Sequence, residues 1–444
     1  MLRARAIGII SLVCLVLTPI PANSFSASSQ ADLFRPGVVL VEMRPGTSPA
    51  LMTRLLADHG LQIERDLAPL PIVSVRVPIG QERATAESLR STGQIASAEL
   101  DYAAHATDVI TPTDPGWINQ WGPSQINAPA AWSVITGTSD VTIAVIDSGI
   151  KLDHEDLAAQ LWTNLDEVPG NLIDDDGNGK IDDVHGWHFY HMWNGSDYIP
   201  SEDANIADDY GHGTHVAGIA AAATNNGVGI AGIAWNARVM PIKVLDQYGT
   251  GWYSDIAAGI IYAADNGARV INLSLGGTED STLLRDAVDY ARGHGALVIA
   301  STGNTGSAVL YPAAYDPVLA VAATDANDQV ASFSNYGPQV DVAAPGVNIY
   351  STWPWVTGYF TKSGTSMAAP HVAGLAALIW SLQPALSASS VTQIMTETTR
   401  DVVLPGWDQY TGWGRIDAYA AVSRAATYRV AFLPVILQQQ SVAP

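Results

Sequence analysis

The sequence contains a single cysteine among its 444 residues, and this residue, Cys14, lies in an apolar stretch near the N-terminus. A chain with one thiol cannot form an internal disulfide, so its stability depends on packing and on any bound ions. A lipid-anchored cysteine usually follows a small residue, and Val13 is not small. We therefore interpret Cys14 as part of the apolar stretch and not as a lipid anchor. Charged residues are also scarce, at 14% against 48% hydrophobic residues. This composition excludes a disordered protein and indicates a globular chain with a large core.

Basic residues are the scarcer of the two charged classes, with 21 Lys and Arg against 43 Asp and Glu. Residues 1–106 hold nine of each kind, whereas residues 107–444 hold 12 basic and 34 acidic residues. Sixteen of the acidic residues lie between Asp147 and Asp209. Such a surface excludes nucleic acid as a partner, and the local crowding of carboxylates points to bound cations.

Residues 7–17, near the N-terminus, are nearly all apolar. Arg3 and Arg5 precede this run, and Pro19 and Pro21 interrupt the chain after it. The run is too short for a membrane span but has the form of a secretory signal. We therefore expect residues 1–25 to be a signal peptide and the protein to be secreted and extracellular.

Two regions of different pattern follow. Residues 33–104 have the pattern of a small α+β domain, with strands expected at 38–43, 72–77 and 95–100 and helices at 48–59 and 82–91. The small residues of the segment 102–107 suit proteolytic cleavage. From residue 112 short apolar strands alternate with helices, the strands being expected at 141–146, 239–244, 269–274 and 296–300 and the helices at 213–223, 253–266 and 281–294.

This alternation predicts an α/β fold with a mostly parallel sheet covered by helices on both faces. Its chemistry is expected beyond the carboxyl ends of the strands. A helix at 415–426 closes the domain, which we place at residues 112–423. The tail, residues 428–444, contains the apolar segment 430–437, whose role the sequence leaves open.

Three side chains suited to nucleophilic catalysis occur in glycine-flanked turns. Asp147 ends an expected strand, His212 lies in Gly-His-Gly-Thr-His, and Ser366 opens an alanine-rich helix after Gly-Thr. A serine hydroxyl needs an imidazole to take its proton and a carboxylate to hold that imidazole. Each residue alone is explained by a turn cap, a structural histidine or a helix N-cap. The three together favour a catalytic triad.

These motifs resemble those of the subtilisin-family serine proteases, and in particular the thermitase-like branch. The family order of Asp, His and Ser is matched by Asp147, His212 and Ser366. The histidine motif excludes the related acid proteases, which have Glu and Asp in place of the His and Asp of the triad. The resemblance covers residues 112–423 and implies the three-layer subtilisin fold. It also implies that residues 33–104 are a propeptide, which we expect to be removed by self-cleavage near residues 103–108.

The resemblance further implies a site for the substrate. Asn304, in Ser-Thr-Gly-Asn-Thr-Gly, corresponds to the family's oxyanion donor, together with the N–H of Ser366 and, more weakly, the hydroxyl of Thr365. Two chain segments are expected to pair with the substrate backbone as neighbouring strands: Ser274, Leu275 and Gly276, and Gly249, Thr250 and Gly251.

Several nearby residues have less defined roles. Leu310 is a candidate for the floor of the specificity pocket, which would then favour an apolar side chain before the scissile bond. Trp252 and Tyr253 fit an outer apolar pocket and ordinary core packing equally well. His215 and His371 are expected to be structural, because each lies inside its helix.

An acidic loop is the second strong signal. Asp174, Asp176, Asn178 and Asp182 stand at positions 1, 3, 5 and 9 of a calcium loop, with Gly179 at position 6. Position 12 is His185 rather than Glu, which excludes an EF-hand. The loop resembles calcium loops inserted between the catalytic Asp and His of some subtilases. The alternative is a solvated acidic loop, which leaves many carboxylates in mutual repulsion.

A second calcium site is implied by the resemblance alone. Its expected side-chain ligands are Asp114, Asp156 and Asn226, and its expected backbone ligands are the carbonyls of Ala223, Val228 and Ile230. Asp208 and Asp209 belong either to the first site or to the plain surface.

The sequence therefore predicts a secreted, calcium-stabilised, monomeric serine endopeptidase made as a self-processing zymogen. Its partners are expected to be protein or peptide substrates and its own propeptide, with no nucleic acid and no membrane span. One alternative is an inactive subtilase fold that serves as a binding module, although such proteins usually lack a triad member or the oxyanion Asn. Another is a protease that matures only itself or cuts one partner.

Overall fold

The computed structural model describes residues 34–44, 46–102, 109–356 and 358–428. The chain divides into two compact units, residues 1–104 and 105–444. The expected signal peptide, the expected cleavage segment and the tail from residue 429 lie outside the described residues.

The first unit is a four-stranded antiparallel sheet with two helices, in the strand order β2-β3-β1-β4. Alternate residues of β1 are buried, with Val39 and Val41 fully inaccessible, and they pack with Leu56 and Leu89 from the two helices. This period of two is what places one face of the sheet against the helices. The elements are β1 (Phe34–Met43), α1 (Pro49–Asp58), β2 (Gln62–Asp66), β3 (Ile72–Arg76), α2 (Glu82–Ser91) and β4 (Ile95–Tyr102).

The second unit is built on an eight-stranded sheet in the order β12-β11-β10-β9-β5-β8-β6-β7. Every pairing in it is parallel except that of β7 with β6. Its strands are β5 (Thr142–Asp147), β6 (Trp187–Trp193), β7 (Tyr198–Asp203), β8 (Arg238–Lys243), β9 (Val270–Leu273), β10 (Leu297–Ser301), β11 (Leu319–Thr324) and β12 (Val342–Pro345). The expected α/β fold with a mostly parallel sheet is confirmed.

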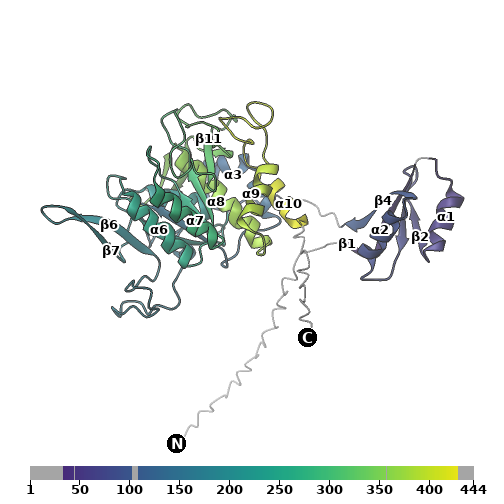
Figure 1. Ribbon diagram of the computed structural model, residues 1–444, viewed down its shortest axis with the longest axis horizontal. Helices are drawn as coiled ribbons and strands as arrows, with labels where there is room; N and C mark the ends of the chain where they lie inside the picture. Colours follow the sequence, from purple (N-terminus) through teal and green to yellow (C-terminus); the bar gives the residue numbers. More distant parts are fainter. Residues whose placement is uncertain (1–33, 45, 103–108, 357, 429–444) are drawn as a thin grey trace, which may run out of the picture. The chain divides into compact units, whose positions relative to one another are not determined.

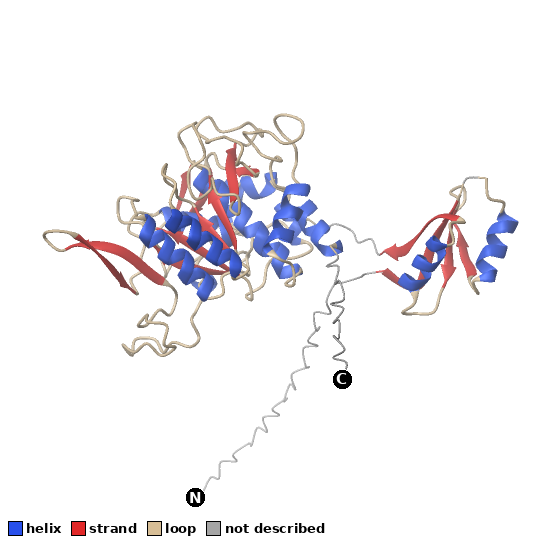
Figure 2. Cartoon of the chain, viewed as in Figure 1, coloured by secondary structure: helices blue, strands red, loops and turns tan. Residues whose placement is uncertain are grey.

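Helices cover both faces of this sheet (Figures 1 and 2). On β5, Ile143 and Val145 enter one core with α5 (His212–Ala221) and α8 (Thr365–Leu382). Ala144 and Ile146, which point the other way, enter a second core with α6 (Tyr253–Asp265) and α7 (Thr282–Gly293). A strand buried on both sides has to be apolar at every position, which explains the continuous apolar runs in the sequence.

Helix α8 is the centre of the first core. Among the described residues it is the one helix long and apolar enough to cross a membrane, but 89% of it is buried inside the unit, as in the core helix of a globular protein. The remaining elements of this unit are η1 (Pro115–Asn119), α3 (Gly122–Gln125), α4 (Ala128–Trp132), η2 (Ala158–Gln160), the β13 (Ile349–Thr352) and β14 (Tyr359–Lys362) hairpin, α9 (Ala388–Glu397) and α10 (Ala418–Thr427).

The last helix begins later than expected. It starts at Ala418 rather than at residue 415, because the side chain of Asp417 accepts a hydrogen bond from the N–H of Ala420 and caps the helix there. Arg415 lies before the helix, is 1% exposed, and pairs with Asp328 at 2.8 Å. The sequence also did not predict the β6–β7 hairpin, which extends beyond α6 at the left of Figure 1.

Candidate active site

Asp147 and His212 meet at the carboxyl edge of the sheet. Asp147 is the last residue of β5 and is fully buried, while His212 is the first residue of α5. Nδ1 of His212 lies 2.8 Å and 2.9 Å from the two carboxylate oxygens of Asp147. The carboxylate therefore accepts the Nδ1 proton, which leaves Nε2 as the basic nitrogen of the neutral ring.

A second carboxylate, Asp208, connects the segments that carry this pair. One of its oxygens accepts hydrogen bonds from Ser148 Oγ at 2.8 Å and from the N–H of Gly211 at 2.7 Å. The other accepts from the N–H and the hydroxyl of Thr214, at 2.9 Å and 2.6 Å, in the first turn of α5. Asp208 thus ties the residue after Asp147 to the start of the histidine helix. The sequence had left it as either a calcium ligand or a surface residue.

Two cations lie near the pair, and sequence reasoning missed both. Lys243, which is 3% exposed, donates to Asp209 Oδ1 and to the carbonyl of Ser148, both at 2.7 Å. The ammonium of Lys362 lies 5.8 Å from the ring centre of Tyr210 and 4.8 Å from that of Trp353. Burial lowers the pKa of Lys362, while the carboxylates of Asp147 and Asp208 act in the opposite direction.

Ser366 is the second residue of α8, where unpaired backbone N–H groups and the helix dipole favour negative charge. Its Oγ donates to the carbonyl of Ser274 at 3.1 Å, and the Ser274 hydroxyl donates back to the carbonyl of Ser366 at 2.9 Å. The described residues contain no hydrogen bond between Ser366 and His212. Catalytic hydrogen bonds are often formed only when substrate is present, and a rotation about χ1 of the serine changes the partner of its hydroxyl.

Asn304 follows β10 and is held by the residue before the serine. Its Oδ1 accepts hydrogen bonds from the N–H of Thr365 at 2.8 Å and from the Thr365 hydroxyl at 3.0 Å. The same hydroxyl accepts from the N–H of Gly303 at 3.1 Å. Thr365 is fully buried and so orients the amide, which differs from the direct helper role that the sequence suggested. Within the described part of the chain the Nδ2 donors of Asn304, an exposed residue, have no partner.

The segment Ser274–Gly276 lies beside this loop. Gly277 pairs with Tyr311 through two backbone hydrogen bonds of 2.9 Å, which bring the neighbouring Leu310 against the segment. A Cβ added to Gly276 would lie 3.0 Å from Cβ of Leu310, and one added to Gly303 would lie 2.8 Å from Cγ of Leu310. Leu310 therefore fills the space between this segment and the Asn304 loop, where a pocket floor was expected.

The segment Gly249–Gly251 packs against Tyr210, whose ring centre lies 6.3 Å from that of His212. A Cβ on Gly249, whose φ is +73°, would come within 2.7 Å of the Tyr210 ring, and one on Gly251 would collide with the carbonyl of Val244. Only glycine permits this close packing. Thr250 between them is exposed.

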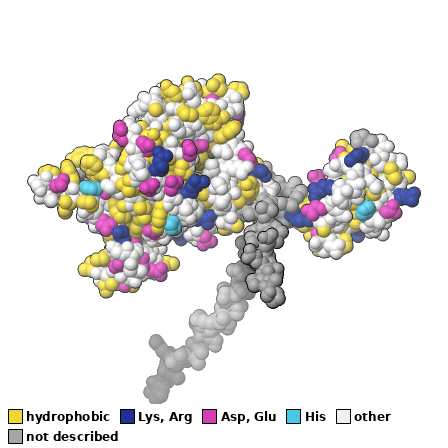
Figure 3. Space-filling model, viewed as in Figure 1, with side chains coloured by type: hydrophobic (Ala, Val, Ile, Leu, Met, Phe, Trp, Pro, Cys, Tyr) yellow, Lys and Arg dark blue, Asp and Glu magenta, His cyan; other side chains and the backbone are white. Residues whose placement is uncertain are grey.

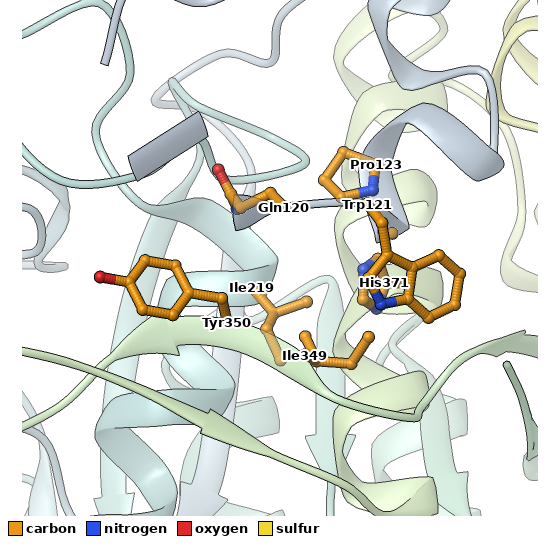
Figure 4. A pocket seen from close by; sticks show the side chains of 8 residues that line it. Gln120, Trp121, Pro123, Ile219, Ile349, Tyr350 and His371 are labelled. Carbon is orange, nitrogen blue, oxygen red and sulfur yellow. The ribbon is translucent and has the colours of Figure 1, made fainter. Parts of the chain in front are cut away.

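His215 and His371 are buried away from solvent. Nε2 of His215 faces the carbonyls of Ile349 and Phe360, and burial lowers its pKa to about 3. Nδ1 of His371 donates to the carbonyl of Met367, and burial lowers its pKa to about 4. His371 also borders the cavity of Figure 4, whose volume of about 10 Å³ suits at most one water molecule. Both histidines thus stay neutral and bind backbone carbonyls, which fits a structural role.

Comparison with known proteins decides the family. The sequence profile of the subtilase family matches residues 138–414, which include Asp147, His212, Asn304 and Ser366. The chain belongs to the subtilase family. It is 45% identical to thermitase of Thermoactinomyces vulgaris over 314 residues, covering 70% of this chain and 99% of that one. It is 38% identical to the thermophilic serine proteinase of Bacillus sp. strain AK1 over 412 residues, 92% of each chain.

A solved structure supports the same conclusion. A protease of Pseudoalteromonas arctica PAMC 21717 is 34% identical, with a TM-score of 0.60, and the match covers 71% of this chain and all of that one. The protein is therefore a subtilisin-type serine protease with a thermitase-like sequence.

This subtilase also contains a group of acidic side chains suited to a metal ion. Oxygens of Glu167, Asp176 and Asp183 lie within 4.8 Å of one another, and Glu167 and Asp183 are buried. Nδ2 of Asn178 donates to Asp176 at 2.9 Å and to Asp183 at 3.1 Å, and Asn164 Nδ2 donates to the same two carboxylates at 2.9 Å. Sequence reasoning missed Glu167 and Asp183 because neither stands at a position of the loop template that it tested.

The other expected ligands of this loop have different partners. Oxygens of Asp174 accept the N–H groups of Gly177 and Gly179 at 2.8 Å and 2.9 Å. The carboxylate of Asp182 accepts the N–H groups of Gly170, Asn171 and Leu172 at 2.7–3.2 Å. Both carboxylates therefore order the backbone of the loop, and neither is among the three that lie within 4.8 Å of one another.

The side chains expected to form the second calcium site lie together around Asn226. Its Nδ2 donates to Asp156 at 2.8 Å and its backbone N–H to Asp114 at 3.1 Å, and both aspartates are buried. Burial raises the pKa of Asp156. The three residues whose carbonyls are the expected backbone ligands lie beside this group. The N–H of Ile230 donates to the Asp156 carboxylate, that of Ala223 to the Asp156 carbonyl, and that of Val228 to the side chain of Asn226.

Proposed function

We propose that this protease is a secreted, calcium-stabilised endopeptidase that is made as a zymogen and cuts peptide bonds with Ser366. His212 Nε2 takes the proton of the Ser366 hydroxyl as the oxygen attacks the substrate carbonyl. Asp147 holds the ring in the tautomer that this transfer needs and stabilises the imidazolium that forms. The observation that carries the proposal is the pair of contacts, 2.8 Å and 2.9 Å, between the buried Asp147 carboxylate and His212 Nδ1.

The oxyanion that forms in this step is assigned to Asn304 and to the N–H of Ser366. Thr365 occupies the amide oxygen of Asn304, so that the NH₂ end is left to donate to the substrate. The start of α8 adds the positive end of its dipole. His212 then protonates the leaving amine, and water, deprotonated by the same ring, hydrolyses the acyl-enzyme.

The acidic group fits calcium. Three carboxylates so close together, two of them buried, repel one another unless a cation neutralises them, and calcium takes six to eight oxygen ligands of this kind. Glu167, Asp176 and Asp183 would hold the ion in one site, and Asp114, Asp156 and Asn226 in the other. When bound, the ion crosslinks loops of a chain that has no disulfide.

Secretion and zymogen processing rest on the N-terminal sequence. One relative, 37% identical, is named an extracellular serine protease, that of Natrialba magadii. Residues 33–104 contain a domain with its own core, as expected of a propeptide that folds separately from the protease. We propose self-cleavage near residues 103–108 and a monomeric mature enzyme.

The deciding experiment is hydrolysis of casein by the purified mature protein, with the Ser366→Ala variant as control. We expect the wild type to degrade casein and to be labelled by a fluorophosphonate, and the variant to do neither and to remain as precursor. A wild-type protein that binds casein without cutting it would instead support the binding module. A protein that cuts its own precursor but not casein would support a protease restricted to its own maturation.

A further inference from the structure

The β6–β7 hairpin ends in large apolar side chains that its own unit leaves exposed. Trp193 and Tyr198 face each other across the two strands, with ring centres 5.1 Å apart, and they are 56% and 54% exposed. Trp252, which precedes α6, lies 5.9 Å from Tyr198 and is 53% exposed. We call these three side chains the aromatic surface. The hydrophobic side chains at the left of Figure 3 belong to this part of the molecule. Exposed aromatic side chains gathered in one patch are typical of binding sites.

The hairpin is held firmly where it meets the rest of the unit. His191 Nδ1 lies 2.9 Å from a carboxylate oxygen of Asp255 in the first turn of α6, and both side chains are largely buried. Phe189 packs against Tyr262 of the same helix, with ring centres 6.1 Å apart. The aromatic surface is therefore fixed relative to α6 and to the segment that precedes that helix.

The aromatic surface continues the segment Gly249–Gly251. Trp252 is the next residue after Gly251. At its other end the segment packs against Tyr210, whose ring lies 6.3 Å from that of His212. The segment therefore runs from the neighbourhood of His212 outward to the aromatic surface.

The direction of this segment determines which part of a substrate meets the aromatic surface. We take the substrate to add as a strand antiparallel to Gly249–Gly251, so that it runs inward, from the aromatic surface towards Ser366. The substrate residues nearest the scissile bond on its N-terminal side pair with the three residues of the segment. Substrate residues still further from the scissile bond then lie over the aromatic surface. Such residues rise about 3.4 Å apiece along the strand.

The charge of the region indicates the kind of residue that binds. The hairpin contains Asp197, Glu202 and Asp203 and no Lys or Arg of its own, and Lys180 from the preceding loop pairs with Glu202 at 2.8 Å, at the end of the hairpin away from Trp193 and Tyr198. Acidic substrate residues are therefore disfavoured there, and the aromatic rings favour apolar ones.

We propose that Trp193, Tyr198 and Trp252 form a binding surface for apolar residues of the protein substrate that precede the segment paired with Gly249–Gly251. This inference rests on the proposed function, since it takes Ser366 as the nucleophile and Gly249–Gly251 as a substrate edge. It gives the enzyme a preference for long, apolar polypeptides that a short peptide cannot reveal.

The test uses the mature enzyme and three substrates. One is a short acyl-tetrapeptide nitroanilide, and the other two are internally quenched peptides with the same residues around the scissile bond. These two are extended on the N-terminal side by Ile-Val-Ile-Val or by Ser-Gly-Ser-Gly, and mass spectrometry verifies that both are cut at the same bond. We expect kcat/KM of the wild type to be about tenfold higher for the apolar extension than for the Ser-Gly extension.

The hairpin itself offers a matched control. Met192 and Ile199 form the neighbouring cross-strand pair and are 48% and 37% exposed, but they point to the opposite face of the hairpin. The double variant Trp193→Ser/Tyr198→Ser is expected to lose the tenfold preference, whereas Met192→Ser/Ile199→Ser keeps it. Both are expected to cleave the nitroanilide within about twofold of the wild type, because neither pair approaches the catalytic residues.

Each contrary result has a distinct meaning. A wild type that cleaves the nitroanilide but shows no preference for the apolar extension overturns this inference and leaves the proposed function standing. Equal loss of the preference in both variants assigns the hairpin a merely structural role and overturns it too. The Ser366→Ala protein is also tested for vesicle binding and for dimerisation. If either occurs and only the Trp193→Ser/Tyr198→Ser change abolishes it, the surface belongs to another occupant and the inference is overturned. A wild type inactive on every substrate would overturn the proposed function itself.

Discussion

The hydroxyl of Thr365 donates to Oδ1 of Asn304 at 3.0 Å, although 61 residues separate the two in the chain. The backbone N–H of Thr365 donates to the same oxygen at 2.8 Å. The residue before Ser366 thus determines which end of the Asn304 amide is left free to donate. This links the proposed nucleophile to the proposed oxyanion donor through one fully buried side chain.

Asn304→Ala is expected to lower kcat about 10²–10³-fold with little change in KM, because the donor acts on charge that develops only in the transition state. Thr365→Val removes the orienting hydroxyl and is expected to lower kcat about tenfold, while Thr365→Ser retains most of the activity. Kinetics on a short chromogenic peptide measure all three. If Thr365 acts through Asn304, the double variant is no slower than Asn304→Ala alone, and additive losses would contradict this.

Asp208 is expected to be required for both stability and rate. Asp208→Ala leaves Ser148, Gly211 and Thr214 without their acceptor and removes a negative charge from the start of α5. We expect a loss of about 2–4 kcal/mol in the free energy of unfolding, measured in the Ser366→Ala background to prevent autolysis. In the active enzyme kcat falls as well, because the His212 segment loses its tie to β5.

The control for Asp208 is Asp153→Asn, which changes an exposed carboxylate paired with Lys151. Such solvent-exposed pairs contribute little to stability, so this variant is expected to unfold like its parent. Equal stability of Asp208→Ala and Asp153→Asn would mean that the hydrogen bonds of Asp208 contribute nothing to the fold.

The pH dependence of stability follows from the two buried histidines. Burial lowers the pKa of His215 to about 3 and of His371 to about 4, below the 6.5 of a solvated histidine. The unfolded chain therefore binds protons that the folded chain does not, and each histidine destabilises the fold as the pH falls from about 6.5 to about 4. The limiting slope is about 1.4 kcal/mol per pH unit for each residue.

Asp341 works in the opposite direction, because burial raises its pKa to about 6 and the folded state binds its proton first. The contribution of one histidine is isolated by comparing His371→Gln with its parent, both carrying Ser366→Ala. Denaturant unfolding between pH 7 and pH 4 is expected to show a flatter decline for His371→Gln, even though this variant is less stable at pH 7. Parallel pH profiles would show that His371 is not buried in the neutral form.

Much of the fold and the pairing of Asp147 with His212 were predictable because the signals are local. The apolar run of β5 predicts a strand buried on both faces, and the glycine-flanked turns place Asp147 and His212 at strand and helix ends. The role of Thr365 was not predictable, because its partner comes from a distant loop and a threonine before a helix usually suggests only a cap. The β6–β7 hairpin was missed because histidines and aromatic residues alternate in it without a clear apolar period.

The acidic loop shows the same limit and provides the last prediction. Spacing placed Asp182 among the ligands, whereas in the fold Asp182 caps the turn at residues 170–172 and its neighbour Asp183 joins Glu167 and Asp176.

We expect excess calcium to raise the melting temperature of the Ser366→Ala protein by about 5 °C over the chelated protein. Asp183→Asn and Glu167→Gln are expected to remove most of this difference, because each takes a charge from the buried group. Asp182→Asn lowers the melting temperature with and without calcium but keeps the difference, since it weakens the loop and not the ion site. A calcium response lost in Asp182→Asn and retained in Asp183→Asn would reverse this assignment.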